Sequence, residues 1–113
     1  MDKQLWHFQY RVVSPEITVI DVQPPAHLPK GTSDAVFDFI HAEIGGLKGL
    51  QVLKPYLTKS EDFSGNGVGV SFHEQNVTFE ALYDQWEPVT IPRADYDELI
   101  FQLEHFLKSF PRK

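Results

Sequence analysis

The sequence predicts a single α+β domain over residues 1–113, with a curved antiparallel sheet of about four to six strands and two principal helices. Three observations support this fold class. Polar and apolar residues alternate near the start of the chain, strand-like alternation returns after residue 67, and the chain closes with a long apolar stripe at helical spacing. Since 42% of the residues are hydrophobic and 13% are aromatic, we expect a packed core and not a disordered tail.

The first elements are predicted to form a β-hairpin. Alternation over residues 5–13 places four apolar side chains on one face of a strand: Trp6, Phe8, Tyr10 and Val12. Residues 17–22 are rich in β-branched side chains, and Ser14-Pro15 supplies a turn, so we expect the two strands to pair antiparallel. Three prolines then make residues 23–31 an extended loop.

A helix is expected to follow, with Thr32 or Ser33 as its N-cap and Gly45-Gly46 at its end. Residues 47–60 fit two patterns. Leucines recur there at helical spacing, but Pro55 would interrupt a helix and residues 50–53 have the character of a strand. We favour a strand or an irregular crossing segment for residues 47–60.

Strands and a long helix complete the predicted domain. A turn at residues 64–67 leads into strands over residues 68–73 and 77–84, and Glu80 and Asp84 are expected to share a solvent-facing side. Residues 89–91 are expected to form a last short strand or an extended entry into the final helix. The apolar stripe from Tyr96 to Phe110 predicts a long amphipathic helix, with acidic residues at its start and basic residues at its end.

The charge is distributed unevenly along the chain. Acidic and basic residues balance over residues 1–60, whereas residues 61–113 hold ten acids and four bases and account for the net charge of −6. An acidic surface repels phosphate and attracts cationic proteins, so we expect a basic protein partner, no direct nucleic-acid binding and no membrane association. The absence of cysteine and of a signal-peptide pattern predicts a cytoplasmic location.

No catalytic, cofactor-binding or metal-binding site is predicted, and we expect a protein that is not an enzyme. The five histidines do not form an HExxH motif, and the chain has no G-x-S-x-G nucleophile elbow. The glycines of residues 65–69 precede a strand and lack the lysine of a phosphate loop, so they indicate a hairpin turn. Asp34 and Asp38 lie four residues apart on a helix, but helix capping and solvation account for both.

Two segments combine acidity with aromatic area and are predicted to bind a partner. In residues 80–87, three carboxylates surround Trp86, and aromatic and charged side chains are efficient anchors for a cationic partner. Tyr83 and Trp86 have an alternative role, which is to close the bottom of the core.

The second segment is on the last helix, where Phe101 and His105 lie side by side next to Asp97. They form either an exposed apolar spot in an acidic field or a contact beneath the first helix. The predicted partner-binding residues of the two segments are Glu80, Asp84, Trp86, Glu87, Asp97 and Phe101.

In general form the chain resembles immunity proteins of bacterial polymorphic toxin and contact-dependent growth inhibition systems. The resemblance covers residues 77–110: an aromatic strand, the segment Trp86-Glu87-Pro88-Val89-Thr90-Ile91-Pro92, and a long amphipathic helix that ends near Phe110. It implies a cytoplasmic inhibitor that binds one cognate toxin, often a basic nuclease domain, and covers its active site or substrate surface.

The alternative function is a small enzyme or ligand carrier with an aromatic pocket. Six side chains are candidates to line such a pocket: Trp6, Phe8, Tyr10, Phe72, Phe79 and Tyr83. The same rings are also suited to form a solid core.

Overall fold

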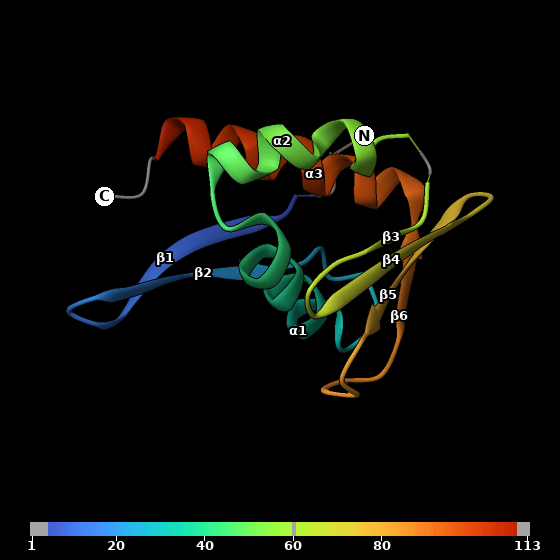
Figure 1. The fold of residues 1–113 in the computed structure, drawn as a ribbon, viewed down its shortest axis with the longest axis horizontal. Coiled ribbons are helices and arrows are strands. Elements are labelled where there is room, and N and C mark those ends of the chain that lie inside the picture. The colour runs from blue at the N-terminus through green and yellow to red at the C-terminus, as the bar shows by residue number, and fades with distance from the viewer. Residues whose placement is uncertain (1–4, 60, 111–113) are drawn as a thin grey trace.

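Six strands and three α-helices build the fold over residues 5–59 and 61–110, which the computed structural model describes. In chain order the elements are β1 (His7–Ser14), β2 (Ile17–Gln23), α1 (Thr32–Asp38), the π-helix η1 (Phe39–Ile44), α2 (Leu47–Leu57), β3 (Phe63–Ser64), β4 (Val68–His73), β5 (Asn76–Ala81), β6 (Val89–Pro92) and α3 (Arg93–Ser109). The α+β class and the long C-terminal helix are confirmed (Figure 1). The strands form two antiparallel sheets, β1-β2 and β3-β4-β5-β6, where the sequence predicts a single one.

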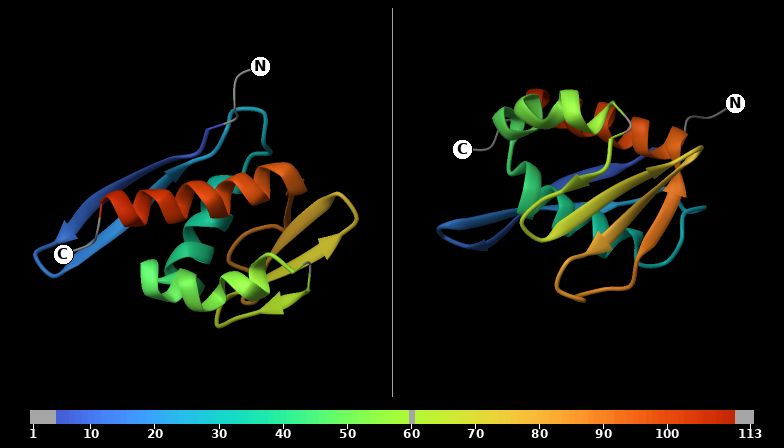
Figure 2. Two further views of the ribbon diagram at one scale, coloured as in Figure 1. Left: turned by 90° about the horizontal axis from the view of Figure 1, so that it is seen from above. Right: turned by 45° about the vertical axis from the view of Figure 1, so that its right-hand side comes forward.

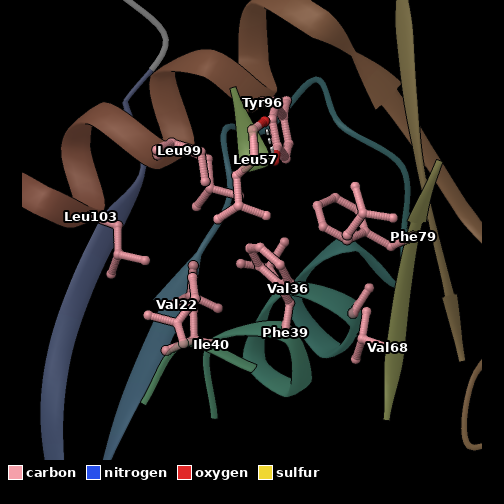
Figure 3. Packing of buried hydrophobic residues seen from close by; sticks show 14 of the residues in the cluster. Val22, Val36, Phe39, Ile40, Leu57, Val68, Phe79, Tyr96, Leu99 and Leu103 are labelled. Carbon is pink, nitrogen blue, oxygen red and sulfur yellow. Dashed lines mark hydrogen bonds between the residues drawn. The ribbon is translucent and has the colours of Figure 1, made fainter. Parts of the chain in front are cut away.

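Helix α1 explains why the strands form two sheets. It contacts β2 on one side and β5 on the other, and it lies between the hairpin and the larger sheet (Figure 2, left). Val36, Phe39 and Ile40 of α1 and η1 are fully buried at the centre of the core (Figure 3). Because a helix fills this position, the hairpin strands cannot hydrogen-bond to the larger sheet.

The β1-β2 hairpin is antiparallel, as predicted, but only part of its apolar face is buried. Trp6 is buried, and the rings of Phe8 and Tyr10 pack on Phe106 of α3 with centroid distances of 5.6 and 5.0 Å. Val12, which the alternation places on the same face as Trp6, Phe8 and Tyr10, is not buried with them, since it is 71% exposed. The far end of the hairpin projects beyond the elements that cover its base (Figure 1).

The predicted N-cap of the first helix is also wrong. Gly31, with a φ of 92°, precedes the helix, and neither hydroxyl caps a free N–H group. Thr32 Oγ1 donates to a carbonyl of the preceding loop (2.7 Å), and Ser33 Oγ donates to a carbonyl of β2 (3.0 Å). The helix ends at Gly45, as predicted, and the Gly45 N–H donates to the Ile40 carbonyl (2.7 Å), five residues back, as in a π-helix.

Residues 47–57 form helix α2, so the strand or irregular segment expected over residues 47–60 is wrong; residue 60 itself lies outside the described residues. Leu50 and Leu57 are fully buried, in agreement with the leucine spacing. Pro55 lies in the last turn, where it removes one hydrogen bond, to the Gln51 carbonyl. Since Gln51 is exposed, we infer that water satisfies this carbonyl.

Helix α3 covers the core above the hairpin and the larger sheet. Its residues Tyr96, Leu99 and Leu103 are fully buried (Figure 3). The Tyr96 hydroxyl donates to the Leu57 carbonyl (3.0 Å), which links α3 to α2, and burial raises the pKa of Tyr96. Phe110, predicted as the last residue of the buried stripe, lies just past the helix and is 60% exposed.

Candidate protein-binding site

The loop of residues 82–88 connects β5 to β6 at the end of the larger sheet that is distant from α3 (Figure 1). Since β5 ends at Ala81, Asp84 lies in this loop, and the expectation that Glu80 and Asp84 share a strand face is wrong. Asp84 has a φ of 55°, a left-handed conformation typical of tight turns. The Leu82 N–H donates to the Gly67 carbonyl (3.0 Å), so the loop lies beside the turn that precedes β4.

Asp38, the last residue of α1, holds this loop against the helix. Its Oδ2 accepts hydrogen bonds from Trp86 Nε1 (2.6 Å) and from Gln85 Nε2 (3.4 Å). Gln85 Nε2 also donates to the Gly67 carbonyl (3.1 Å), and Gln85 Oε1 accepts the Tyr83 N–H (3.0 Å). Trp86 is half-buried and packs on the core. These contacts fix both the loop backbone and the orientation of Trp86.

Glu43 of η1 holds the neighbouring turn. Its carboxylate accepts the backbone N–H groups of Asn66, Gly67 and Val68, each at 2.8 Å, which together form an anion-binding nest. A side chain at Gly65 would overlap this carboxylate, so the close approach requires glycine there. One continuous helical segment, α1 with η1, therefore positions both loops at this end of the molecule.

Four of the six predicted partner-binding residues surround one depression of about 340 Å³. The lining consists of Glu80, Ala81, Asp84, Trp86, Glu87 and Pro88. None of the three carboxylates in this lining forms an ion pair with a residue in the described ranges. Tyr83, on the same loop, is 77% exposed, so it does not close the core. We call Glu80, Tyr83, Asp84, Trp86 and Glu87 the acidic loop surface.

The other two predicted residues, Asp97 and Phe101, lie elsewhere. Both are on α3, which begins at the opposite end of β6 from the acidic loop surface. Asp97 Oδ1 forms an ion pair with Arg93 Nε (2.8 Å), which compensates its charge. Phe101 is 62% exposed and lies along a groove between β1 and α3, not beneath the first helix. The structure therefore separates the predicted residues into two surfaces.

The acidic excess of residues 61–113 does not form one continuous field, because it is interrupted on α3. Lys54 Nζ of α2 forms an ion pair with Glu104 Oε1 (2.9 Å), and this hydrogen bond holds the pKa of Glu104 below its ordinary range. Asp95 is buried, and its Oδ2 lies 3.0 Å from Nε2 of His27. Asp97 and Glu104 of α3 thus each have a basic partner, whereas the three carboxylates of the acidic loop surface have none among the described residues.

The aromatic pocket of the alternative function does not form from the expected residues. Phe79 is fully buried in the core, and Tyr83 lies on the acidic loop surface. Trp6 and Phe8 instead contribute to the groove between β1 and α3, which has a volume of about 340 Å³. Its remaining lining residues are Leu5, His7, Glu98, Phe101, Gln102, His105, Phe106 and Phe110.

Sequence reasoning did not identify Asp38 and Glu43 as supports of the site. Asp38 lies 48 residues before Trp86, and Glu43 lies 23 residues before Asn66. The glycine-rich turn at residues 65–67 is the one local signal, because its bare N–H groups predict a nearby acceptor. Nothing in the sequence shows which of the chain's carboxylates accepts these N–H groups.

Within the described residues, no three histidine, aspartate or glutamate side chains come together in a way that would hold a metal ion. No helix in the same ranges has the length and apolar character needed to cross a membrane. Comparison with protein-family models, with characterised proteins and with solved structures gave no match for this chain.

Proposed function

We propose that this chain is a cytoplasmic immunity protein that binds and neutralises a cognate toxin through the acidic loop surface. One observation supports the proposal most directly. Glu80, Asp84 and Glu87, which form no ion pair with any described residue, surround Trp86, and Asp38 and Gly67 hold the loop that carries Trp86 in place. Negative charge steers a basic partner into contact, and a half-buried tryptophan beside an exposed tyrosine supplies the anchoring area.

A basic nuclease domain is the target class that fits this chemistry. Such a domain binds phosphate groups in a cationic groove, and the carboxylates of Glu80, Asp84 and Glu87 are suited to occupy the same positions. The nucleic acid is then excluded by charge and by bulk. This mechanism requires no reaction, no cofactor and no direct contact between the chain and nucleic acid, and it predicts a one-to-one complex.

The supports of the loop also favour tight binding. A loop that is ordered before it meets its partner loses little conformational entropy on association, so more of the contact energy appears as affinity. The hydrogen bond from Trp86 to Asp38 and the Glu43 carboxylate beneath the adjoining turn provide this order in the free protein.

The first test is capture from the source lysate at low and moderate salt, followed by native mass spectrometry. We expect a stoichiometric complex with a basic toxin fragment, whose nuclease activity falls when the chain is added back. A stoichiometric partner that is acidic, or a bound toxin that remains fully active, would contradict the proposal.

A charge-reversal pair then tests the placement of the interface. Asp84→Lys with Glu87→Lys should weaken toxin binding more than about tenfold. Glu61→Lys with Glu74→Lys is the matched control, because both residues are exposed and both double variants change the net charge from −6 to −2. Equal loss of affinity in the two variants would show that total charge, and not the acidic loop surface, determines binding. Unchanged melting temperatures would confirm that folding is intact.

A further inference from the structure

The groove between β1 and α3 has a different chemistry from the acidic loop surface. Most of its lining is apolar, from Trp6 and Phe8 on one wall to Phe101 and Phe106 on the other. Its volume of about 340 Å³ lies within the usual range of small-molecule sites, about 300–1,000 Å³.

Apolar side chains around the groove are unusually exposed. Leu5, Phe101 and Phe110 are 52%, 62% and 60% exposed, although each borders the hollow. Ring contacts hold this wall in place, because Phe106 packs on both Phe8 and Phe110 with centroid distances of 5.6 Å. Exposed apolar area around a preformed hollow is typical of a binding site.

Glu98 is the one acidic residue among the lining residues of the groove. Its Oε2 accepts a hydrogen bond from Gln102 Nε2 (3.3 Å), and it forms no ion pair with any residue that the structure describes. The other titratable lining residues are His7 and His105. Within the described residues, the groove therefore combines aromatic walls with a single carboxylate that has no ion-pair partner.

We propose that this groove binds a small organic cation in which an ammonium group is joined to an aromatic or branched apolar body. The apolar body lies against the phenylalanine rings, and the ammonium group lies near Glu98, where both the carboxylate and the ring faces attract it. A neutral or anionic molecule of the same shape lacks this attraction. The proposal does not depend on the toxin-binding function, because the two surfaces share no lining residue.

The two tryptophans make a direct test possible. Trp6 lines the groove and Trp86 lines the depression of the acidic loop surface, so the two indole N–H signals in a ¹⁵N NMR spectrum report on the two surfaces separately. The variant Trp86→Phe assigns them. Titration at pH 7.5 with 4-phenylbutylammonium, 4-phenylbutanol and 4-phenylbutyrate compares a cation, a neutral molecule and an anion of similar size.

We expect the ammonium compound to shift the Trp6 signal in a saturable way, with a Kd about fivefold or more below that of the alcohol. Glu98→Gln should remove this preference, whereas Glu87→Gln, the same change at the acidic loop surface, should preserve it. The proposal is overturned if the alcohol binds as tightly as the ammonium compound, or if Glu98→Gln retains the preference. It is also overturned if no probe shifts Trp6 at millimolar concentration, or if the cation shifts only Trp86.

Discussion

Replacing Glu43 with alanine should destabilise the domain, because this carboxylate is the acceptor for three backbone N–H groups, those of Asn66, Gly67 and Val68. A hydrogen bond to a charged group contributes about 1.5–3 kcal/mol, and less where water competes. The Asn66 donor is exposed and the other two are partly buried. We count about 0.5 kcal/mol for the hydrogen bond from Asn66 and about 1.25 kcal/mol for each of those from Gly67 and Val68. The free energy of unfolding should therefore fall by about 3 kcal/mol.

Urea unfolding followed by circular dichroism measures this loss, and the slope against urea should stay unchanged. For a domain of this size, the melting temperature should fall by roughly 10–15 °C. Glu43→Gln retains one carbonyl acceptor and should lose about half as much stability. Glu80→Ala removes an exposed carboxylate that forms no ion pair with a described residue, and it should stay within about 0.5 kcal/mol of the parent chain. A loss below about 1 kcal/mol for Glu43→Ala would refute the inference that this carboxylate holds the turn.

Two other contacts give measurable predictions. In a double-mutant cycle, Asp38→Ala and Trp86→Phe should show a coupling of about 1–2 kcal/mol in the free energy of unfolding, and a coupling near zero would show that the bond does not hold the loop. The Lys54–Glu104 pair should make stability depend on pH, since the pKa of Glu104 is lowered in the folded state. Its contribution is complete above the pKa of an unfolded glutamate and is lost as the pH falls through the lowered value. Urea midpoints between about pH 7 and pH 3 should therefore fall less steeply for Lys54→Met than for the parent chain, and parallel curves would contradict this.

The sequence predicts the elements whose burial is regular and local. The spacing from Tyr96 to Leu107 is unbroken, and α3 follows it; polar–apolar alternation likewise predicts both hairpins. Helix α2 shows the limit, because Pro55 argues against a helix while the leucines argue for one. The leucines determine the outcome, since a proline in the last turn removes one hydrogen bond whereas a strand would leave Leu50 and Leu57 on opposite faces.

Arrangements that depend on distant parts of the chain are not predictable in this way. The sequence does not show that α1 lies between β2 and β5, and so it does not show that the strands divide into two sheets. Most of the acidic loop surface could be predicted from the sequence, because its residues are close together along the chain. Phe101 has the same acidic and aromatic surroundings in the sequence, but β6 places it at another part of the molecule.

The π-helical winding of η1 determines how the two loop supports are aligned. Asp38 and Glu43 are five residues apart, and in an α-helix this spacing would place their side chains well around the helix from one another. In a π-helix, where each N–H pairs five residues back, the same spacing brings them to one side. Deleting a single residue between them would let the segment wind as an α-helix, with the two carboxylates four residues apart and still on one side, so the π-helical turn accommodates one additional residue without changing their alignment. The wider turn is therefore a spacer, which lets one short helix support two separate loops while its apolar side stays in the core.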